Sequence, residues 1–162
     1  MQRLIEWIVS TDLSWFVVNY GWVWVISESV HFAGLVMLAG TVGMFDLRLL
    51  GIAKGIAPAE LHKLLRFGVL GFALSVGTGI LFIAGTPDQY FYNSAFHLKV
   101  VGLTLMGLNA AFFYARPYRS VHAMGADDDA PRAAKLCAGA SLALIVIVMC
   151  CGRMLTFFRP PS

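Results

Sequence analysis

The sequence has little charge for its length. Only 13% of its 162 residues are Asp, Glu, Lys or Arg, whereas 59% are hydrophobic, and its mean hydropathy is +0.75. A soluble domain uses roughly a quarter of its residues as charges to keep its surface wet. The net charge of +3 is small and dispersed, unlike the dense basic patches that bind nucleic acid. The composition therefore argues against a soluble protein and against a nucleic-acid partner.

Catalytic and metal-binding motifs are also missing. The sequence contains no P-loop, G-x-S-x-G, H-E-x-x-H or dinucleotide fingerprint, which disfavours a hydrolase or a nucleotide-dependent enzyme. Its cysteines, Cys137, Cys150 and Cys151, have neither C-x-x-C nor zinc spacing, so we expect them to be small apolar packing residues. These absences leave open whether the protein is an enzyme at all.

What the sequence does contain is long apolar blocks. Blocks of about 20 residues match a hydrocarbon core of about 30 Å at about 1.5 Å of rise per residue. We predict an all-α fold, an integral membrane four-helix bundle that forms a single domain over residues 1–162, with the lipid bilayer as its first partner. The predicted spans are about 22–45, 64–84, 94–115 and 136–158.

Residues 1–20 read as an interfacial segment before the first span. Apolar residues at helical spacing alternate with Arg3 and Glu6, and Ser10, Thr11 and Asp12 supply a break and a helix N-cap. Aromatic residues cluster at the start of the first span, as in the aromatic belt of a membrane interface. These are Trp7, Trp15, Tyr20, Trp22 and Trp24.

The positions of Lys and Arg predict the orientation. Eight of the 12 lie in or beside the two connections at about 48–66 and 116–135, and the other four are Arg3, Lys99, Arg153 and Arg159. Basic loops stay in the cytoplasm, so we expect both termini to be periplasmic in a bacterial inner membrane. Small residues four apart, such as Ala73 with Gly77, predict close helix packing.

Four ionisable residues interrupt the apolar blocks in the outer half of the predicted bundle. They are Glu28 and His31 in the first span, Lys99 in the third and Arg153 in the fourth. A charge at mid-membrane costs at least about 2.5–3.5 kcal/mol, so such residues usually face the bundle interior with a partner. We predict that these four form one buried polar site. The alternative is a structural salt-bridge network with His31 hydrogen-bonded beside it.

The most specific functional interpretation is electron transfer through haem b or a quinone. His31 would be the axial ligand of haem iron, and Lys99 and Arg153 would pair with the propionates. His97 is the outer-side candidate for a second axial ligand, yet it differs in depth from His31 and projects about 160° away from Lys99. Two other interpretations stay open: proton-linked or small-anion transport by a homo-oligomer, and a structural or assembly subunit of a larger membrane complex.

Other polar residues are expected to have structural roles. Asp46 and Arg48 close the first span at its cytoplasmic end, and Asn109 lies deep in the third span, where we expect an interhelical hydrogen bond. His62 and His122 fall near the cytoplasmic surface, where we expect them to be interfacial.

The arrangement of these residues resembles a family of small four-span bacterial membrane proteins of unknown function. Its first helix is similar to the segments His31-Phe-Ala-Gly34 and Asp46-Leu-Arg48-Leu-Leu-Gly51 of this chain, and its second is similar to Gly77-Thr-Gly79. Its third helix is similar to Asn93-x-x-Phe96-x-x-Lys99 and Gly107-Leu-Asn109-Ala, and its fourth is similar to Gly152-Arg153. The resemblance covers roughly residues 22–156. It implies the architecture and singles out His31, Asp46, Arg48, Lys99 and Arg153, but it implies no reaction. Where that family carries a basic residue this chain has His97, which argues against a shared ligand there. The layout is also loosely similar to small membrane cytochromes b.

Overall fold

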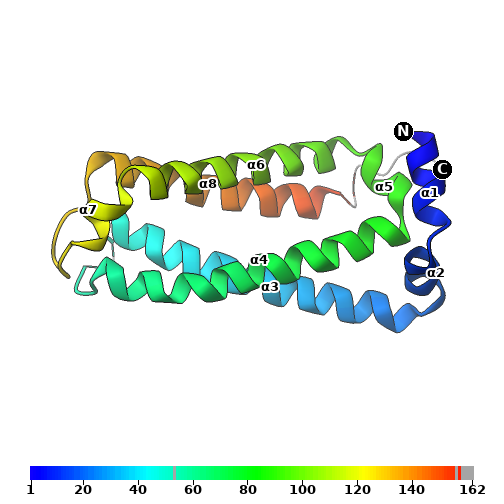
Figure 1. The fold of residues 1–162 in the computed structure, drawn as a ribbon, viewed down its shortest axis with the longest axis horizontal. Coiled ribbons are helices and arrows are strands. Elements are labelled where there is room, and N and C mark those ends of the chain that lie inside the picture. The colour runs from blue at the N-terminus through cyan, green and yellow to red at the C-terminus, as the bar shows by residue number, and fades with distance from the viewer. Residues whose placement is uncertain (53, 156, 158–162) are drawn as a thin grey trace.

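The computed structural model describes residues 1–52, 54–155 and 157, and within that part the chain is helical, without strands. Figure 1 shows the order of the helices along the chain. They are α1 (Gln2–Val9), α2 (Asp12–Asn19), α3 (Gly21–Leu49), α4 (Pro58–Gly85), α5 (Pro87–Phe91), α6 (Ser94–Ala115), α7 (Tyr118–His122) and α8 (Arg132–Met154).

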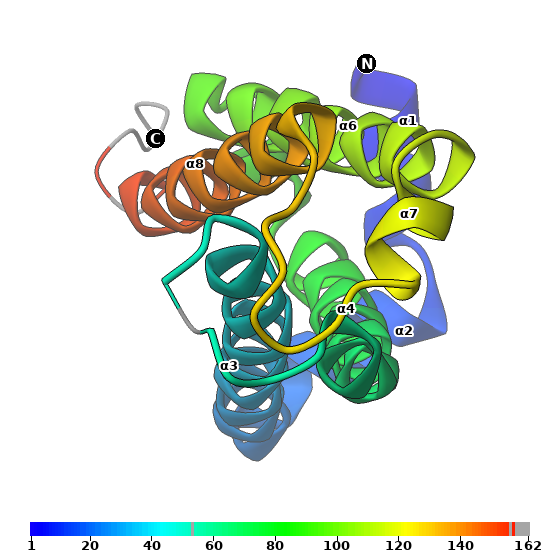
Figure 2. The ribbon, with the colours of Figure 1, turned by 90° about the vertical axis from the view of Figure 1, so that its left-hand side faces the viewer.

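The four long helices form two pairs. α3 packs along α4 and α6 packs along α8, and the pairs touch mainly where α3 meets α8. Figures 1 and 2 show the α6–α8 pair lying above the α3–α4 pair. The α3–α4 connection and α7 lie at one end, which we call the loop end, and α1, α2 and α5 lie at the other, which we call the α5 end.

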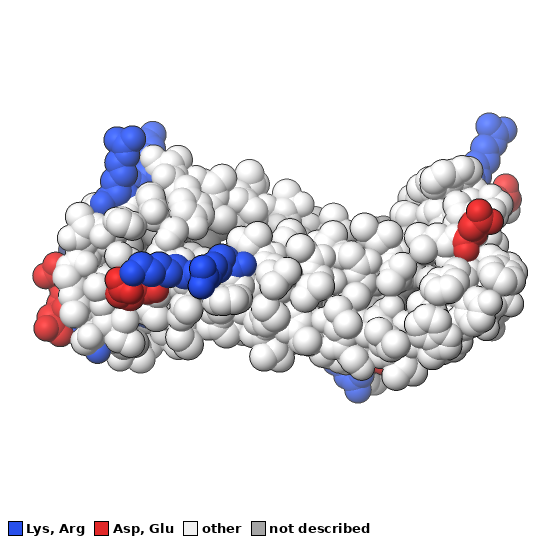
Figure 3. All heavy atoms as spheres, turned by 60° about the horizontal axis from the view of Figure 1, so that its bottom comes forward, with Lys and Arg blue, Asp and Glu red and all other residues white. Residues whose placement is uncertain are grey.

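The chain is a multi-pass membrane protein. Within the described residues, α3, α4, α6 and α8 are each long and apolar enough to cross a bilayer. Figure 3 shows charged residues gathered towards the two ends, with a broad, largely uncharged surface between them. Apolar side chains that are mostly exposed, such as Val36, Val69 and Leu108, belong in lipid rather than in water.

The predicted span over 94–115 coincides with α6, and the other boundaries shift. α3 and α4 continue into the loop end beyond the apolar blocks, to Leu49 and from Pro58. Pro58 occupies the first turn of α4, where its missing N–H costs no helical hydrogen bond. α8 begins earlier and ends earlier than predicted, at Arg132 and Met154, and the last predicted positions include residues outside the described part.

Glycines let α3 and α4 approach at backbone distance. A Cβ placed on Gly34 would lie 2.6 Å from the Gly71 carbonyl oxygen, and one on Gly71 would lie 2.5 Å from the Gly34 carbonyl oxygen. Lipid supplies no hydrophobic drive for helix association, so this close packing carries much of the attraction between the helices.

The small-residue pair predicted at Ala73 and Gly77 does not make such a contact. A Cβ on Gly77 would meet nothing within 4 Å, and both residues are exposed. The packing face of α4 instead contains Gly68, Gly71, Ser75 and Thr78, which are buried at helical spacing. The sequence predicted two small-residue pairs on α4, Ala73 with Gly77 and Ser75 with Gly79, and of these residues Ser75 lies on the packing face.

The tightest apolar core lies at the loop end, where both helix pairs meet α7. It contains Phe45 and Leu49 of α3, Phe113 of α6 and Ala134 of α8, together with Val121 of α7. Gly51 and Gly55 have φ of +92° and +99°, a region that L-residues with a Cβ rarely adopt, and they allow the short turn from α3 to α4.

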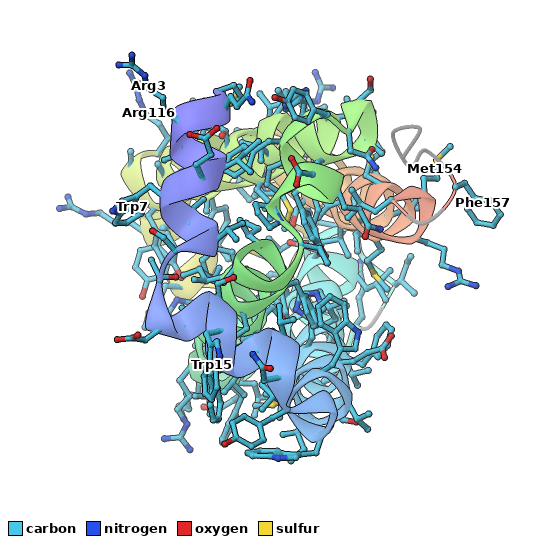
Figure 4. The ribbon with its side chains drawn as sticks, turned by 90° about the vertical axis from the view of Figure 1, so that its right-hand side faces the viewer. Arg3, Trp7, Trp15, Arg116, Met154 and Phe157 are labelled. Carbon is cyan, nitrogen blue, oxygen red and sulfur yellow. The ribbon has the colours of Figure 1, made fainter. Side chains whose placement is uncertain are left out.

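Two short helices cover the α5 end, as predicted for residues 1–20. The Thr11 hydroxyl caps α2 by accepting from the Ser14 amide at 3.3 Å. Figure 4 shows Trp7 and Trp15 projecting from these helices, and both side chains are mostly exposed. This is the expected arrangement for aromatic residues at a membrane interface.

The α3–α4 contact can be tested with a matched pair of single-methyl additions. Gly71→Ala forces a Cβ against the α3 backbone and should lower the free energy of unfolding by about 1–3 kcal/mol. Gly77→Ala has open space and should be neutral or stabilising by up to about 1 kcal/mol, because alanine favours helix. Reversible unfolding in mixed detergent–SDS micelles measures both. Equal effects would contradict the packing described here.

Candidate functional site

His31 lies on α3 in the half of the bundle nearer the α5 end. Its Nδ1 lies 2.8 Å from the Thr78 hydroxyl oxygen on α4. That hydroxyl has a single proton, and backbone carbonyl oxygens accept it at 2.7 Å from Leu74 or 3.2 Å from Ser75. When either carbonyl oxygen accepts the hydroxyl proton, the Thr78 oxygen is the acceptor and His31 Nδ1–H is the donor, so we assign the Nδ1–H tautomer from this network. In the neutral ring this leaves Nε2 with a free lone pair.

The His31 ring is half-buried among aromatic side chains. The centroid of Phe82 lies 5.5 Å from it in an edge-on arrangement, and that of Phe32 lies 6.5 Å away. The Ser75 hydroxyl donates to the His31 carbonyl oxygen at 3.4 Å, a long contact that adds a second link between the helices. The ring is thus held on one side by α4, and Nε2 is the nitrogen left for another partner.

Lys99 of α6 is brought to the same region. Its side chain is half-buried, and its Nζ lies 3.7 Å from the position a Cβ would take on Gly152 of α8. Lys99 also lies close enough to His31 for its positive charge to act on the imidazole. An imidazole from α3 and an ammonium from α6 therefore share the interior between the two helix pairs.

Glu28 and Arg153, the other two members of the predicted site, are exposed. The Glu28 carboxylate instead lies near Tyr90 of α5. Burial, followed by this charge, raises the pKa of the Tyr90 phenol above its ordinary value. Among the described residues, ion pairs join Lys54 and Lys135 to Asp129 and Lys63 to Glu60, so Glu28 and Lys99 do not form a salt bridge.

His97 is exposed on α6, where its ring contacts Phe96 with centroids 6.3 Å apart. It is two residues from the inward-facing Lys99, so the two side chains leave the helix in nearly opposite directions. Sequence reasoning missed Thr78, which fixes the orientation of His31. Its signal was a hydroxyl residue between two glycines, Gly77 and Gly79, inside an otherwise apolar span.

A second polar group lies between the helix pairs towards the loop end. Asp46 of α3, Asn109 of α6 and Ser141 of α8 line a cavity of about 310 Å³. Asn109 Nδ2 donates to the Cys137 carbonyl oxygen at 3.0 Å and so joins α6 to α8. The Ser141 hydroxyl interacts with the Asp46 carboxyl group, whose Oδ2 has no hydrogen-bond partner among the described residues.

Arg48 is fully buried at the loop end and joins the two connections. Its Nε donates to the Ile56 carbonyl oxygen at 2.6 Å, which holds the α3–α4 connection. Its Nη2 donates to the carbonyl oxygens of Gly125, Ala126 and Asp128 at 3.1, 2.6 and 3.2 Å, which holds the segment before α8. Asp46 and Arg48 were expected to close the helix together, but their side chains have separate partners.

His62 and His122, expected at the interface, belong to an aromatic cluster at the loop end. His62 is half-buried, and its Nε2 lies 3.1 Å from the Tyr114 hydroxyl. Its ring contacts Tyr118 and His122 with centroids 5.1 and 6.3 Å apart. This cluster packs α4 against α6 and α7.

The fold and these polar groups define a class, a four-span integral membrane protein with histidine and carboxylate side chains between its helix pairs. Residues 4–158 match the model of the family described as "Family of unknown function (DUF6644)", and the chain belongs to that family. Comparison with curated proteins and with solved structures gave no match.

The Arg48 contacts predict a large and specific stability effect. Arg48→Ala leaves the part-buried carbonyl oxygens of both connections without their donor and should cost about 3 kcal/mol of unfolding free energy. Arg48→Lys should recover only part of this, because an ammonium cannot reproduce the planar fork. The control Arg119→Ala, at an exposed position of α7, should change stability by less than about 0.5 kcal/mol. An Arg48→Ala protein as stable as this control would show that Arg48 does not hold the two connections together.

Proposed function

We propose that this protein takes part in electron transfer and that His31 and Lys99 bind a quinone, or alternatively haem b, in the outer half of the bilayer. The observation that carries the proposal is the 2.8 Å contact between His31 Nδ1 and the Thr78 hydroxyl oxygen. It orients the imidazole and keeps Nε2 available, which is the arrangement that second-shell partners give to ligand-binding histidines.

A quinol suits the two side chains chemically. Neutral His31 Nε2 accepts the proton of one quinol hydroxyl group, and the Lys99 ammonium donates a hydrogen bond to a quinol or quinone oxygen atom. Both groups lie in a lipid-shielded interior, where such electrostatic interactions are stronger than in water. Phe82 and Phe32 supply aromatic surface beside the imidazole for a ring-shaped ligand.

Haem b is the alternative occupant, and the donor set fits it in part. His31 Nε2 suits an axial ligand and Lys99 suits a propionate. His97 is exposed and leaves α6 on the side away from Lys99, so His31 is the axial candidate at this site among the described residues. A haem here would have one protein ligand, His31, and would supply one-electron chemistry when bound. A quinone needs no second axial ligand, so it fits His31 and Lys99 better than haem b does.

Binding measurements on purified protein test the proposal. We expect a short-chain benzoquinol to bind the protein in lipid nanodiscs, His31→Ala to weaken binding by about tenfold or more, and Thr78→Val to weaken it less. His97→Ala, an exposed histidine, is the matched control and should bind normally. An absorption spectrum of protein from haem-sufficient cells distinguishes the cofactors, since bound haem gives a Soret band. Colourless protein that binds benzoquinol equally with and without His31 would refute the proposal.

We also propose a bacterial inner-membrane location with the loop end in the cytoplasm and the α5 end in the periplasm. Support comes from eight Lys and Arg in or beside the loop-end connections. A cysteine introduced by Asp88→Cys should react with a membrane-impermeant maleimide in intact spheroplasts, whereas one introduced by Lys54→Cys should react only after lysis. The reverse pattern would overturn this orientation.

A further inference from the structure

We propose that the cavity at Asp46 is a second ligand site, one that takes a small aromatic molecule carrying a hydroxyl group. The cavity lies between the α3–α4 and α6–α8 pairs, and every long helix contributes to its wall. Asp46 is about 15 residues beyond His31 on α3, or roughly 22 Å along the helix axis. The site is therefore separate from the one proposed for electron transfer and does not depend on it.

The Asp46 carboxyl group carries the inference. Only 5% of the residue is exposed, and Oδ2 has no hydrogen-bond partner among the described residues. A buried polar atom without a partner costs free energy, and an ionisable group within a membrane costs more, so such groups are kept mainly where they have a function. Asp46 is one of the residues that line the cavity, so a ligand in the cavity lies beside its carboxyl group.

The neighbouring groups leave Asp46 Oδ2 in need of a donor. The Arg48 guanidinium, two residues away, binds backbone carbonyl oxygens of the connections through Nε and Nη2, and Nη1 has no partner among the described residues. Asn109 donates one of its two amide N–H groups to the Cys137 carbonyl oxygen, which leaves one N–H and its carbonyl oxygen for other partners. The Tyr114 hydroxyl contacts His62. The Ser141 hydroxyl contacts the Asp46 carboxyl group, but Oδ2 stays without a partner among the described residues, and a complementary ligand supplies a hydroxyl proton to it.

Size and wall chemistry define the rest of the ligand. A volume of about 310 Å³ lies at the lower end of the range for small-molecule pockets, which suits one or two fused rings. The wall away from Asp46 is apolar and includes Leu38, Phe72, Leu103 and Met106. Together these features select a compact aromatic body with one hydrogen-bond donor, and they exclude a macrocycle.

Equilibrium dialysis of the protein in lipid nanodiscs tests the site. The amount of probe that partitions into empty nanodiscs is subtracted from the amount bound. The probes are 1-naphthol and 1-methoxynaphthalene, which share an aromatic body but differ in the hydroxyl proton. We expect 1-naphthol to bind at least about tenfold more tightly than the ether, because a hydrogen bond from a hydroxyl group to a carboxylate is stronger than one between two neutral groups.

Two substitutions separate the donor contact from the cavity. Asp46→Leu replaces the carboxyl group by an apolar side chain of similar length, so 1-naphthol should bind only as well as the ether. Ala110→Phe adds a ring to a residue that lines the cavity, and it should abolish binding of both probes. Ala111→Phe, the same change at the adjacent exposed position outside the wall, is the matched control and should bind normally.

The outcomes are distinct. Equal binding of the two probes to the unsubstituted protein would mean that the cavity is an apolar gap filled by lipid, and would overturn the proposal. Binding of 1-naphthol that survives Ala110→Phe would place the probe elsewhere and also overturn it. His31→Ala should leave 1-naphthol binding unchanged, so failure at His31 and failure at Asp46 can be told apart. Size-exclusion chromatography shows whether Asp46→Leu and Ala110→Phe fold, and Ala110→Phe tests the cavity with Asp46 in place.

Discussion

The structure depends on how a bundle holds together in a solvent that is as apolar as its own side chains. Lipid gives no hydrophobic drive for helix association, so close backbone contact and internal polar contacts must supply it. The α3–α4 pair uses the first, through Gly34 and Gly71. The second is seen where His31 meets Thr78, where Asn109 meets Cys137, and where Arg48 gathers the carbonyl oxygens of both connections.

The arrangement of the four long helices in two pairs explains where the polar side chains lie. Each helix pair is tightly packed within itself, whereas the two pairs meet mainly through α3 and α8 and at the loop-end core. The remaining space between the pairs is where His31 and Lys99 lie towards one surface and where Asp46 lines a cavity towards the other. A bundle built only for stability would fill such space with apolar side chains, so the interior between the pairs is the place to look for function.

The spans could be predicted because hydrophobic length is a one-dimensional property of the chain. The 94–115 span needed no correction, and the end of α8 shifted because apolar residues after Met154 carry no signal for where a helix stops. The two short helices within residues 1–20 and the Thr11 cap could also be predicted, because helix caps depend on local sequence.

The membership of the site could not be predicted in the same way, because it depends on which face of each helix meets its neighbours. Glu28 and His31 are three residues apart and share a helical face by spacing, yet Glu28 is exposed and His31 contacts Thr78. The same limitation left the packing face of α4 undecided between the pair Ala73 and Gly77 and the pair Ser75 and Gly79, and it missed Gly71. The Asp46 cavity arises from the separation of two helix pairs, a distance that no spacing along one chain segment encodes.

The central claim is that Thr78 holds His31 as a donor through Nδ1 and leaves Nε2 for a ligand. Nitrogen-15 NMR of selectively labelled histidine in lipid bilayers measures this directly, with His31→Gln used to assign the signal. We predict that neutral His31 carries its proton on Nδ1 and has a bare Nε2, and that Thr78→Val removes this preference. A neutral His31 protonated on Nε2, unaffected by Thr78→Val, would contradict the account.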